Sequence, residues 1–169
     1  MPINNEEQLH GAAFLRLLEE MSVQAPEIKL SVSNLLGRNF YLVTAAKPGF
    51  LGKWKSTSFG IVIKISNKRR SPWRYTYTKE NQDELAAIFK ENGEVFSIYV
   101  AGEDGFACLS HKQLKEVLDE NHEEIEWVSI SRRLRENYRV AGTDGRREQT
   151  LAGNSFPQKI IEHIISTIG

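Results

Sequence analysis

Cysteine is almost absent from this chain, because Cys108 is the single one among 169 residues. A lone cysteine excludes an intrachain disulfide and any zinc site built from several thiolates. Such sparse use of cysteine is typical of a reducing compartment, so we expect a cytoplasmic protein. A secretory signal is also missing, and no apolar run approaches the roughly 20 residues that span a bilayer. We therefore expect no membrane among its partners.

Carboxylates are missing from one long segment. Residues 28–79 contain eleven lysines and arginines but no aspartate or glutamate, and we call this stretch the basic segment. Residues 80–126, the acidic segment, hold thirteen acids against three bases, so the net charge of zero hides a separation of the two signs. An ordinary surface mixes both signs. The pattern predicts an electrically lopsided molecule whose basic side is shaped for a polyanion.

The patterns of known catalytic sites are missing as well. The four histidines, His10, His111, His122 and His163, are scattered, without the close pair that places two metal ligands on one helix face. No residue is marked as a nucleophile, and Cys108 lies in an apolar run that predicts a small buried side chain. His111 follows a predicted helix start, where we expect it to be exposed. The sequence favours a protein without catalytic residues, metal ligands or a cofactor.

Hydrophobic periodicity predicts a mixture of helices and strands. The predicted helices cover about 5–22, 79–91, 110–118 and 155–167. The predicted strands are 28–32, 40–43, 59–66, 73–78, 95–100, 106–109, 127–132 and 136–140, with residues 67–72 as a hairpin-like tip between two of them. Capping boxes formed by Ser110 with Gln113 and by Ser155 with Gln158 predict the starts of the last two helices.

This order of elements predicts the fold class. Strict alternation of strand and helix is missing, so a doubly wound parallel sheet is disfavoured. We expect one α+β domain over residues 1–169, with a mixed or largely antiparallel sheet flanked by about four helices. Its length is sufficient for a core of its own.

One short motif occurs twice. Residues 100–105 read Val-Ala-Gly-Glu-Asp-Gly and residues 140–145 read Val-Ala-Gly-Thr-Asp-Gly. Both copies lie where a hairpin should turn, and glycine and aspartate supply the backbone freedom and the caps that turns need. We interpret them as two similar turns. A calcium or phosphate loop is the alternative, although a calcium loop needs more oxygen ligands at regular spacing.

The basic segment interleaves its cations with aromatic residues, the combination found on nucleic-acid-binding surfaces. Trp54, between two lysines, is the best candidate for stacking on an unpaired base. Trp73, Tyr75 and Tyr77 alternate with polar residues, and at least two of them are expected to face the core. The candidate nucleic-acid-binding residues are Lys53, Trp54, Lys55, Lys64, Lys68, Arg69, Arg70, Arg74, Arg132 and Arg133.

A second group of arginines lies near the C-terminus, at positions 132, 133, 135, 139, 146 and 147. It extends the basic segment if the last hairpin folds beside that segment. It could equally pair with the acidic segment, and the sequence leaves both arrangements open.

The predicted order from the first helix to the strand at 95–100 resembles that of PD-(D/E)XK nuclease-like domains over about 100 residues. In that family an acid-x-lysine tripeptide lies on the third strand, and here Val62-Ile63-Lys64 keeps only the lysine. Because metal-dependent hydrolysis needs carboxylates to hold Mg²⁺, the resemblance implies a non-catalytic relative with a basic cleft. A nuclease would need other acids in that role, such as Glu19, Glu20, Glu103 or Asp104.

The function predicted from these observations is a DNA- or RNA-binding accessory module without catalysis of its own. Two alternatives stay open. One is a divergent metal-dependent nuclease. The other is a protein-interaction module whose acidic segment binds a basic partner, or whose two charged halves meet head to tail in an oligomer.

Overall fold

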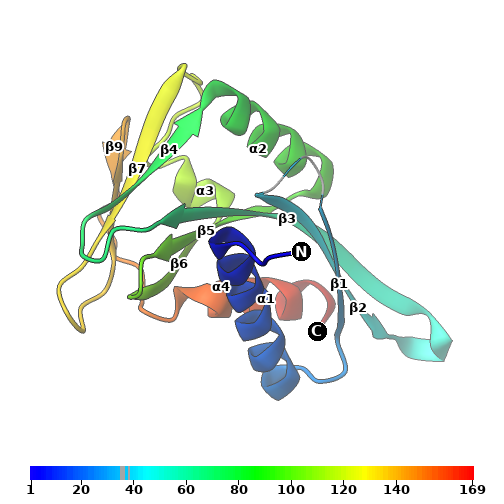
Figure 1. Ribbon diagram of the computed structural model, residues 1–169. Helices are drawn as coiled ribbons and strands as arrows, with labels where there is room; N and C mark the ends of the chain where they lie inside the picture. The colour runs from blue at the N-terminus through cyan, green and yellow to red at the C-terminus, as the bar shows by residue number, and fades with distance from the viewer. Residues whose placement is uncertain (35–36, 38) are drawn as a thin grey trace.

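Four α-helices and nine strands form within residues 1–34, 37 and 39–169, which are the part of the chain that the computed structural model describes (Figure 1). The helices are α1 (Asn5–Gln24), α2 (Lys79–Asn92), α3 (His111–Leu114) and α4 (Ser155–Ile168). The strands are β1 (Lys29–Asn34), β2 (Phe40–Pro48), β3 (Trp54–Ser66), β4 (Trp73–Thr78), β5 (Val95–Ala101), β6 (Gly105–Leu109), β7 (Ile125–Ser131), β8 (Arg139–Gly142) and β9 (Gly145–Arg146). A short 3-10 turn, η1 (Phe50–Gly52), joins β2 to β3. The predicted α+β class is confirmed.

The first sheet has the strand order β1-β2-β3-β5-β6, with one parallel pair between β3 and β5 and antiparallel pairs elsewhere. Its central strands are apolar on both faces. Side chains such as Ile61 and Ile98 pack with α1 and α4, while Val62 and Tyr99 belong to a second core on the opposite face. The parallel pair needs a crossover, and α2 provides it.

The second sheet is antiparallel and has the order β4-β7-β8-β9. Its inner face meets the first sheet through Trp73, Tyr75 and Tyr77, all of which are buried. The expectation that at least two of these aromatic residues face the core is confirmed for all three. Their alternation with exposed polar residues leaves the outer face of the sheet to solvent.

Residues 67–72 do not form the predicted hairpin tip, because β3 and β4 belong to different sheets. The chain instead crosses from one layer to the other at this point. The indole nitrogen of Trp73 donates to the backbone oxygen of Lys68 at 2.8 Å, which fixes the crossing segment against the start of β4. Local alternation identified both strands, whereas their pairing depends on the tertiary packing of the aromatic face.

The two repeated motifs form hairpin turns, between β5 and β6 and between β8 and β9, as predicted. The Ser110 capping box is confirmed, with the hydroxyl accepting from the backbone N–H of Gln113. The Ser155 capping box is wrong. The Ser155 hydroxyl accepts from the backbone N–H of Cys108 in β6, so a tertiary contact takes the place of the local cap.

Within the described residues, no helix combines the length and the apolar character that crossing a membrane requires.

Candidate polyanion-binding face

One row of outward-facing side chains runs across all four strands of the second sheet. Arg74 on β4 lies opposite Ser129 on β7, Ser129 lies opposite Ala141 on β8, and Ala141 lies opposite Arg146 on β9. Three strand spacings separate the two arginines along this row, or about 14 Å between their backbones. The two ends of one cross-strand row are therefore both cationic.

An aromatic residue is stacked on one end of the row. The guanidinium carbon of Arg74 lies 4.4 Å from the centre of the Trp127 ring, and Trp127 occupies the neighbouring outward position on β7. Ring and cation attract each other, and the stack holds the guanidinium plane in one orientation. Arg74 is thus presented to solvent in an ordered position.

Together these residues line an open hollow of about 600 Å³. Its lining residues are Arg74, Trp127, Ser129, Ser131, Arg139, Val140, Ala141, Arg146, Arg147, Glu148 and Thr150. Hydroxyl groups and arginines dominate this list, and both bind phosphate oxygens. We call the outer face formed by Arg74, Trp127, Ser129, Ser131, Arg139 and Arg146 the arginine face.

Two acids moderate the charge of this face. Glu148 lines the hollow itself, and Glu136 forms an exposed ion pair with Arg139 at 3.9 Å. Exposed pairs of this kind are weak and yield readily to a stronger anion. Arg147 also lines the hollow, but its guanidinium is buried and its Nε donates to Glu116 at 2.8 Å. We therefore do not count it as part of the exposed arginine face.

The basic side chains continue from the arginine face toward the β3–β4 crossing. A second, smaller hollow of about 190 Å³ shares Ser131 and Arg139 with the first and adds Ser71 and Arg133. Directly before Ser71 in the chain stand Lys68, Arg69 and Arg70, which are exposed and which we call the basic loop. Of the described residues that line the hollow beside this loop, Glu103 is the one acid. The C-terminal arginines therefore do extend part of the basic segment.

Arg132, a predicted nucleic-acid contact, is bound to groups within the protein. Its Nε donates to Asp104 at 2.7 Å, its guanidinium lies 4.3 Å from the centre of the Tyr138 ring, and its backbone N–H donates to Ser71. The Tyr138 hydroxyl donates to the same carboxylate at 2.9 Å. Burial and the carboxylate of Asp104 raise the pKa of Tyr138. Arg132 thus ties the β5–β6 turn to the second sheet.

The predicted residues Lys53, Trp54 and Lys55 lie far from the arginine face. They occupy the turn at one end of β3, whereas the basic loop follows the other end (Figure 1). The 13 residues of this strand separate the two ends by up to about 40 Å. The structure therefore divides the basic segment into two cationic regions.

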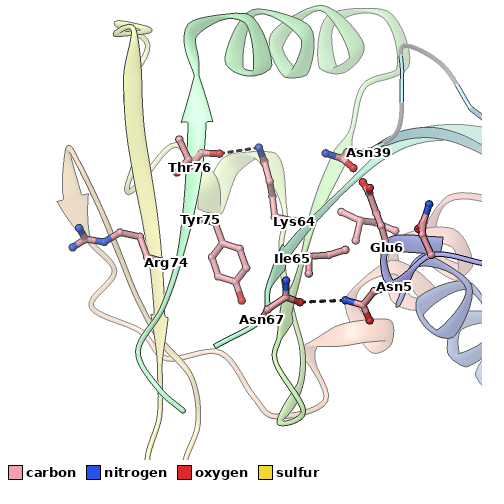
Figure 2. A pocket seen from close by; sticks show the side chains of 11 residues that line it. Asn5, Glu6, Asn39, Lys64, Ile65, Asn67, Arg74, Tyr75 and Thr76 are labelled. Carbon is pink, nitrogen blue, oxygen red and sulfur yellow. Dashed lines mark hydrogen bonds between the residues drawn. The ribbon is translucent and has the colours of Figure 1, made fainter. Parts of the chain in front are cut away.

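Lys64, also predicted, points into the interior between the two sheets (Figure 2). Its Nζ donates to the backbone oxygen of Thr76 at 2.8 Å and to Oδ1 of Asn81 at 3.0 Å, and it lies 4.4 Å from the centre of the Tyr77 ring. Burial lowers the pKa of Lys64 to about 8, against the opposing effect of Glu84. This lysine is a poor surface contact for phosphate.

Lys64 lines a cavity of about 680 Å³ between the start of α1 and the strands β3 and β4. Glu6 and Asn39 point toward this space in Figure 2, and the Asn5 amide donates to Asn67 across one side of it at 3.2 Å. Arg74 contributes to its rim but projects away toward the arginine face. The four acids considered for a migrated metal site, Glu19, Glu20, Glu103 and Asp104, are not among the residues that line it.

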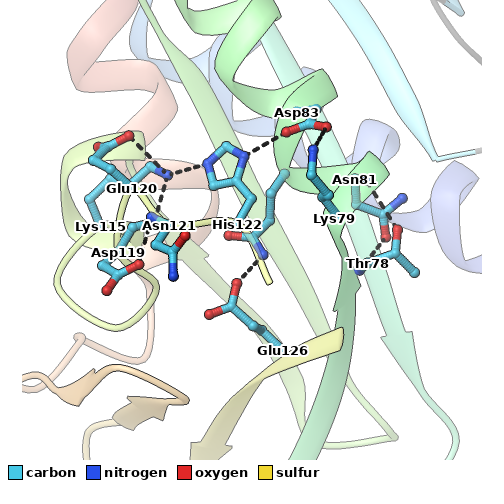
Figure 3. A network of polar contacts seen from close by, with 11 residues as sticks. Thr78, Lys79, Asn81, Asp83, Lys115, Asp119, Glu120, Asn121, His122 and Glu126 are labelled. Carbon is cyan, nitrogen blue, oxygen red and sulfur yellow. Dashed lines mark hydrogen bonds and ion pairs between the residues drawn. The ribbon is translucent and has the colours of Figure 1, made fainter. Parts of the chain in front are cut away.

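Three carboxylates could hold a metal ion elsewhere. Oxygen atoms of Asp119, Glu126 and Asp144 lie within 4.8 Å of one another. Glu126 is fully buried, and Gln82 donates to it (Figure 3). Burial chiefly raises the pKa of Glu126, and contact with Asp144 acts in the same direction while the Gln82 hydrogen bond opposes it. A proton shared between the carboxyl groups of Glu126 and Asp144 explains their close approach as well as a bound cation does.

Several charges of the acidic segment are paired with one another or with Lys79, the last residue of the basic segment. His122 lies between Asp83, at 2.8 Å from its Nδ1, and Lys115, at 3.3 Å from its Nε2 (Figure 3). Lys79 donates to the same Asp83 carboxylate at 2.7 Å. The hydrogen bonds from Lys79 and His122 lower the pKa of Asp83. This network joins α2 to the segment that follows α3.

The prediction that His111 is exposed is wrong. Its ring stacks on Phe89 of α2 at 4.2 Å between centroids, and the residue is buried. Burial lowers the pKa of His111 to about 4, and the neighbouring Lys115 adds to this effect. Helix α3 is short and lies against α2 and β5, so its first residue faces the protein.

Sequence patterns did not single out Trp127 or Ser129. Their signal is alternation along β7, where Glu126, Val128 and Ile130 are buried and the residues between them are not. That alternation shows that the strand has a buried and a less buried face. It does not show, from sequence alone, that the face with Trp127 and Ser129 has no other element packed on it. Arg139 and Arg146 were recognised as part of a basic cluster, and the missing information was the β4–β7 pairing that places them beside Arg74.

Comparisons with protein-family models, with curated proteins and with solved structures give no match to this chain. The geometry of its own residues therefore carries the functional argument.

Proposed function

We propose that this protein binds nucleic acid, DNA or RNA, through the arginine face and the adjoining basic loop, as an accessory module without catalysis of its own. Arginine is the side chain best suited to phosphate, because its planar guanidinium donates two parallel hydrogen bonds. Serine hydroxyls between the arginines supply further donors to phosphate oxygens. Trp127 is half-buried and lines the same hollow, so its ring offers a surface for contact with sugar or base.

The observation that carries this proposal is the convergence of cations from distant parts of the sequence. Arg74 comes from the basic segment and Arg139 and Arg146 come from the C-terminal hairpin, yet all three line one hollow. Their convergence depends on the β4–β7 pairing. Such a surface attracts a polyanion over a distance and then holds it by direct contacts.

A salt titration tests the proposal. Fluorescence anisotropy with a labelled duplex and a labelled single strand should give binding at low salt that weakens steeply as salt increases. About six phosphate contacts correspond to a log-log slope of about −5 on a duplex and about −4 on a single strand. Absence of binding at low salt would refute the proposal, and salt-sensitive self-association in its place would support interaction through the acidic segment.

A divergent nuclease is a second candidate, and one observation favours it. Glu6 and Lys64, an acid and a lysine from different elements, line the same cavity together with Asn39. A single carboxylate is the lower limit for a Mg²⁺ site, which usually takes one or two carboxylates with waters and substrate oxygens. Mn²⁺-dependent cleavage that is lost in a Glu6→Gln variant would establish this activity, and its absence at every metal concentration would remove it.

A further inference from the structure

The hairpin of β2 and β3 ends in an apolar tip that no other described part of the chain covers. Phe50 is 85% exposed, Leu51 81% and Trp54 56%. The turn is closed by two hydrogen bonds, from the Gly49 N–H to the Lys53 oxygen at 2.7 Å and from the Lys53 N–H to the Phe50 oxygen at 3.2 Å. Figure 1 shows this turn projecting away from the helices. We call residues 47–55 the hairpin tip.

Backbone strain accompanies this exposure. Leu51 has φ 55° and ψ 35°, the left-handed conformation that a leucine rarely adopts. Glycine or asparagine would occupy it at lower cost. A strained residue whose apolar side chain is held in water is characteristic of a binding element rather than of a structural turn.

Lysines stand directly behind the apolar side chains. In the hairpin register Pro48 lies opposite Trp54, and one rung further from the turn Lys47 lies opposite Lys55. Like charges that face each other across an antiparallel pair destabilise it unless an anion lies between them. Lys29 on β1 adds a cation 5.5 Å from the centre of the Trp54 ring. The tip thus has an apolar end followed by a cationic layer.

We propose that the hairpin tip inserts into the interface of an anionic lipid bilayer. In this arrangement Phe50 and Leu51 enter the boundary of headgroups and acyl chains, and Trp54 lies at headgroup depth, where aromatic rings are favoured. Lys47 and Lys55 then meet the lipid phosphates and carboxylates. This inference is independent of the proposed nucleic-acid binding. It differs from the expectation of no membrane partner, which was drawn from the lack of a spanning segment, because a peripheral contact needs no such segment.

The kinds of cation favour a bilayer over nucleic acid at this tip. Among the described residues, the cations of the tip and its neighbour on β1 are the lysines Lys29, Lys47, Lys53 and Lys55, whereas Arg74, Arg139 and Arg146 gather on the arginine face. A lysine extends its flexible stem over apolar surface and keeps its ammonium at the headgroups. Leu51, in the middle of the η1 turn, has no flat ring to stack on a base. Arginine and a stacked ring, which suit phosphate and base recognition, are found together at Arg74 instead.

Vesicle binding tests the proposal with the full chain. Sedimentation should show binding to vesicles of roughly seven parts phosphatidylcholine to three parts phosphatidylserine, and much weaker binding to phosphatidylcholine alone. Tryptophan emission should shift to the blue on binding, and the shift should vanish in a Trp54→Phe variant, because Trp73 is already buried and Trp127 lies on the arginine face, away from the tip. Binding should weaken as salt increases.

Two double variants separate the apolar and the cationic contributions. Phe50→Ser with Leu51→Asn should lower the partition coefficient at least about tenfold on both lipid mixtures. Lys47→Gln with Lys55→Gln should lower it by about tenfold or more on the anionic mixture only. Leu134→Ser is the matched control, since Leu134 is as exposed, at 85%, but lies between β7 and β8. It should bind like the parent protein.

Three results would overturn the proposal. One is absence of binding to the anionic vesicles at low salt, and another is an equal loss in the Leu134→Ser control. The third is a loss of oligonucleotide affinity in the Phe50→Ser, Leu51→Asn variant with vesicle binding unchanged, which would make the tip a wedge between bases. Lys47 is half-buried and the other substituted side chains are exposed. Cooperative thermal unfolding at or above the melting temperature of the parent protein will therefore confirm that each variant is folded.

Discussion

The Arg74 guanidinium lies over the Trp127 ring, with 4.4 Å between its central carbon and the ring centre. The two residues come from segments about 50 positions apart that become neighbours when β4 pairs with β7. This contact joins the basic segment to the C-terminal arginines. The arginine face therefore has a stacked pair, Arg74 on Trp127, in addition to its separate charges.

Replacing Arg74 by Lys should distinguish the contribution of its charge to nucleic-acid binding from the contribution of its planar, stacked guanidinium. Lysine keeps the cation but loses the planar stack and the paired donors, so we expect nucleic-acid affinity to fall about three- to tenfold with little change in the salt slope. Arg74→Gln should also reduce the slope by about one. Anisotropy measures both quantities. Arg16→Lys is the matched control, because Arg16 lies 4.8 Å over Phe106, on another element, and a similar loss there would contradict a specific role for Arg74.

Replacing Asp104 by Asn should destabilise the fold. Asp104 accepts from both Arg132 and Tyr138, and the amide would leave a half-buried guanidinium without its counter-ion. We expect the free energy of unfolding to fall by about 1–3 kcal/mol. Urea unfolding should show a lower midpoint with an unchanged slope. The neighbouring Glu103→Gln should stay within about 0.5 kcal/mol of the parent protein, and equal losses in both variants would refute the assignment.

The sequence was sufficient for much of this fold because local patterns determine it. Alternation predicted that at least two of Trp73, Tyr75 and Tyr77 face the core, and all three do. The glycine and aspartate of the repeated motif identified two hairpin turns. The second sheet could not be foreseen in the same way. Whether the strand ending at Ser66 pairs with the one that begins at Trp73 depends on which aromatic face has a core to cover, and that is a tertiary property.

His111 should make stability depend on pH. Its pKa is about 6.5 in the unfolded chain and is lowered to about 4 in the folded protein. The unfolded state therefore binds more protons between these values, so the stabilising effect of neutral His111 is complete above about pH 6.5 and is lost as pH falls toward 4. His10 and His163 act in the same direction, and Glu126 acts in the opposite one.

A His111→Phe variant isolates this contribution. Phenylalanine preserves the stack on Phe89 and does not titrate, so the variant should lose less stability than the parent protein between pH 6.5 and 4. Urea unfolding at several pH values in that window gives the comparison. Parallel curves for the two proteins would show that His111 is as solvated in the folded state as in the unfolded one.

Replacing Leu51 by Asn should stabilise the isolated protein. Asparagine tolerates the left-handed conformation at position 51, and an exposed leucine makes no packing contribution there. We expect an increase in the free energy of unfolding of about 0.5–1 kcal/mol. Thermal unfolding measures it, with Phe50→Ser as a neighbouring control that should have little effect. A lower melting temperature for Leu51→Asn would show that the leucine side chain supports the turn.

The candidate site was only half visible in the sequence. Absence of acids from residues 28–79 indicated a cationic surface, but the length of β3 sends Lys53 and Lys55 to one end of the molecule and the basic loop to the other. Lys64 sits between two isoleucines, as an outward residue of a one-sided sheet would. Its face is in fact covered by β4 and α2. A charge pattern in the sequence shows how many cations a segment contains. It does not show which of those cations a long strand places at opposite ends of the molecule.

The most direct test of the proposed nucleic-acid binding compares two variants of equal charge. One carries Arg74→Gln, Arg139→Gln and Arg146→Gln, and the other carries Lys47→Gln, Lys53→Gln and Lys55→Gln, so each removes three cations. Anisotropy titrations across a range of salt should give the arginine variant a salt slope smaller in magnitude by about two to three and at least about a tenfold loss of affinity, with the lysine variant close to the parent protein. Equal losses in the two variants, or a larger loss in the lysine variant, would contradict the assignment of nucleic-acid binding to the arginine face.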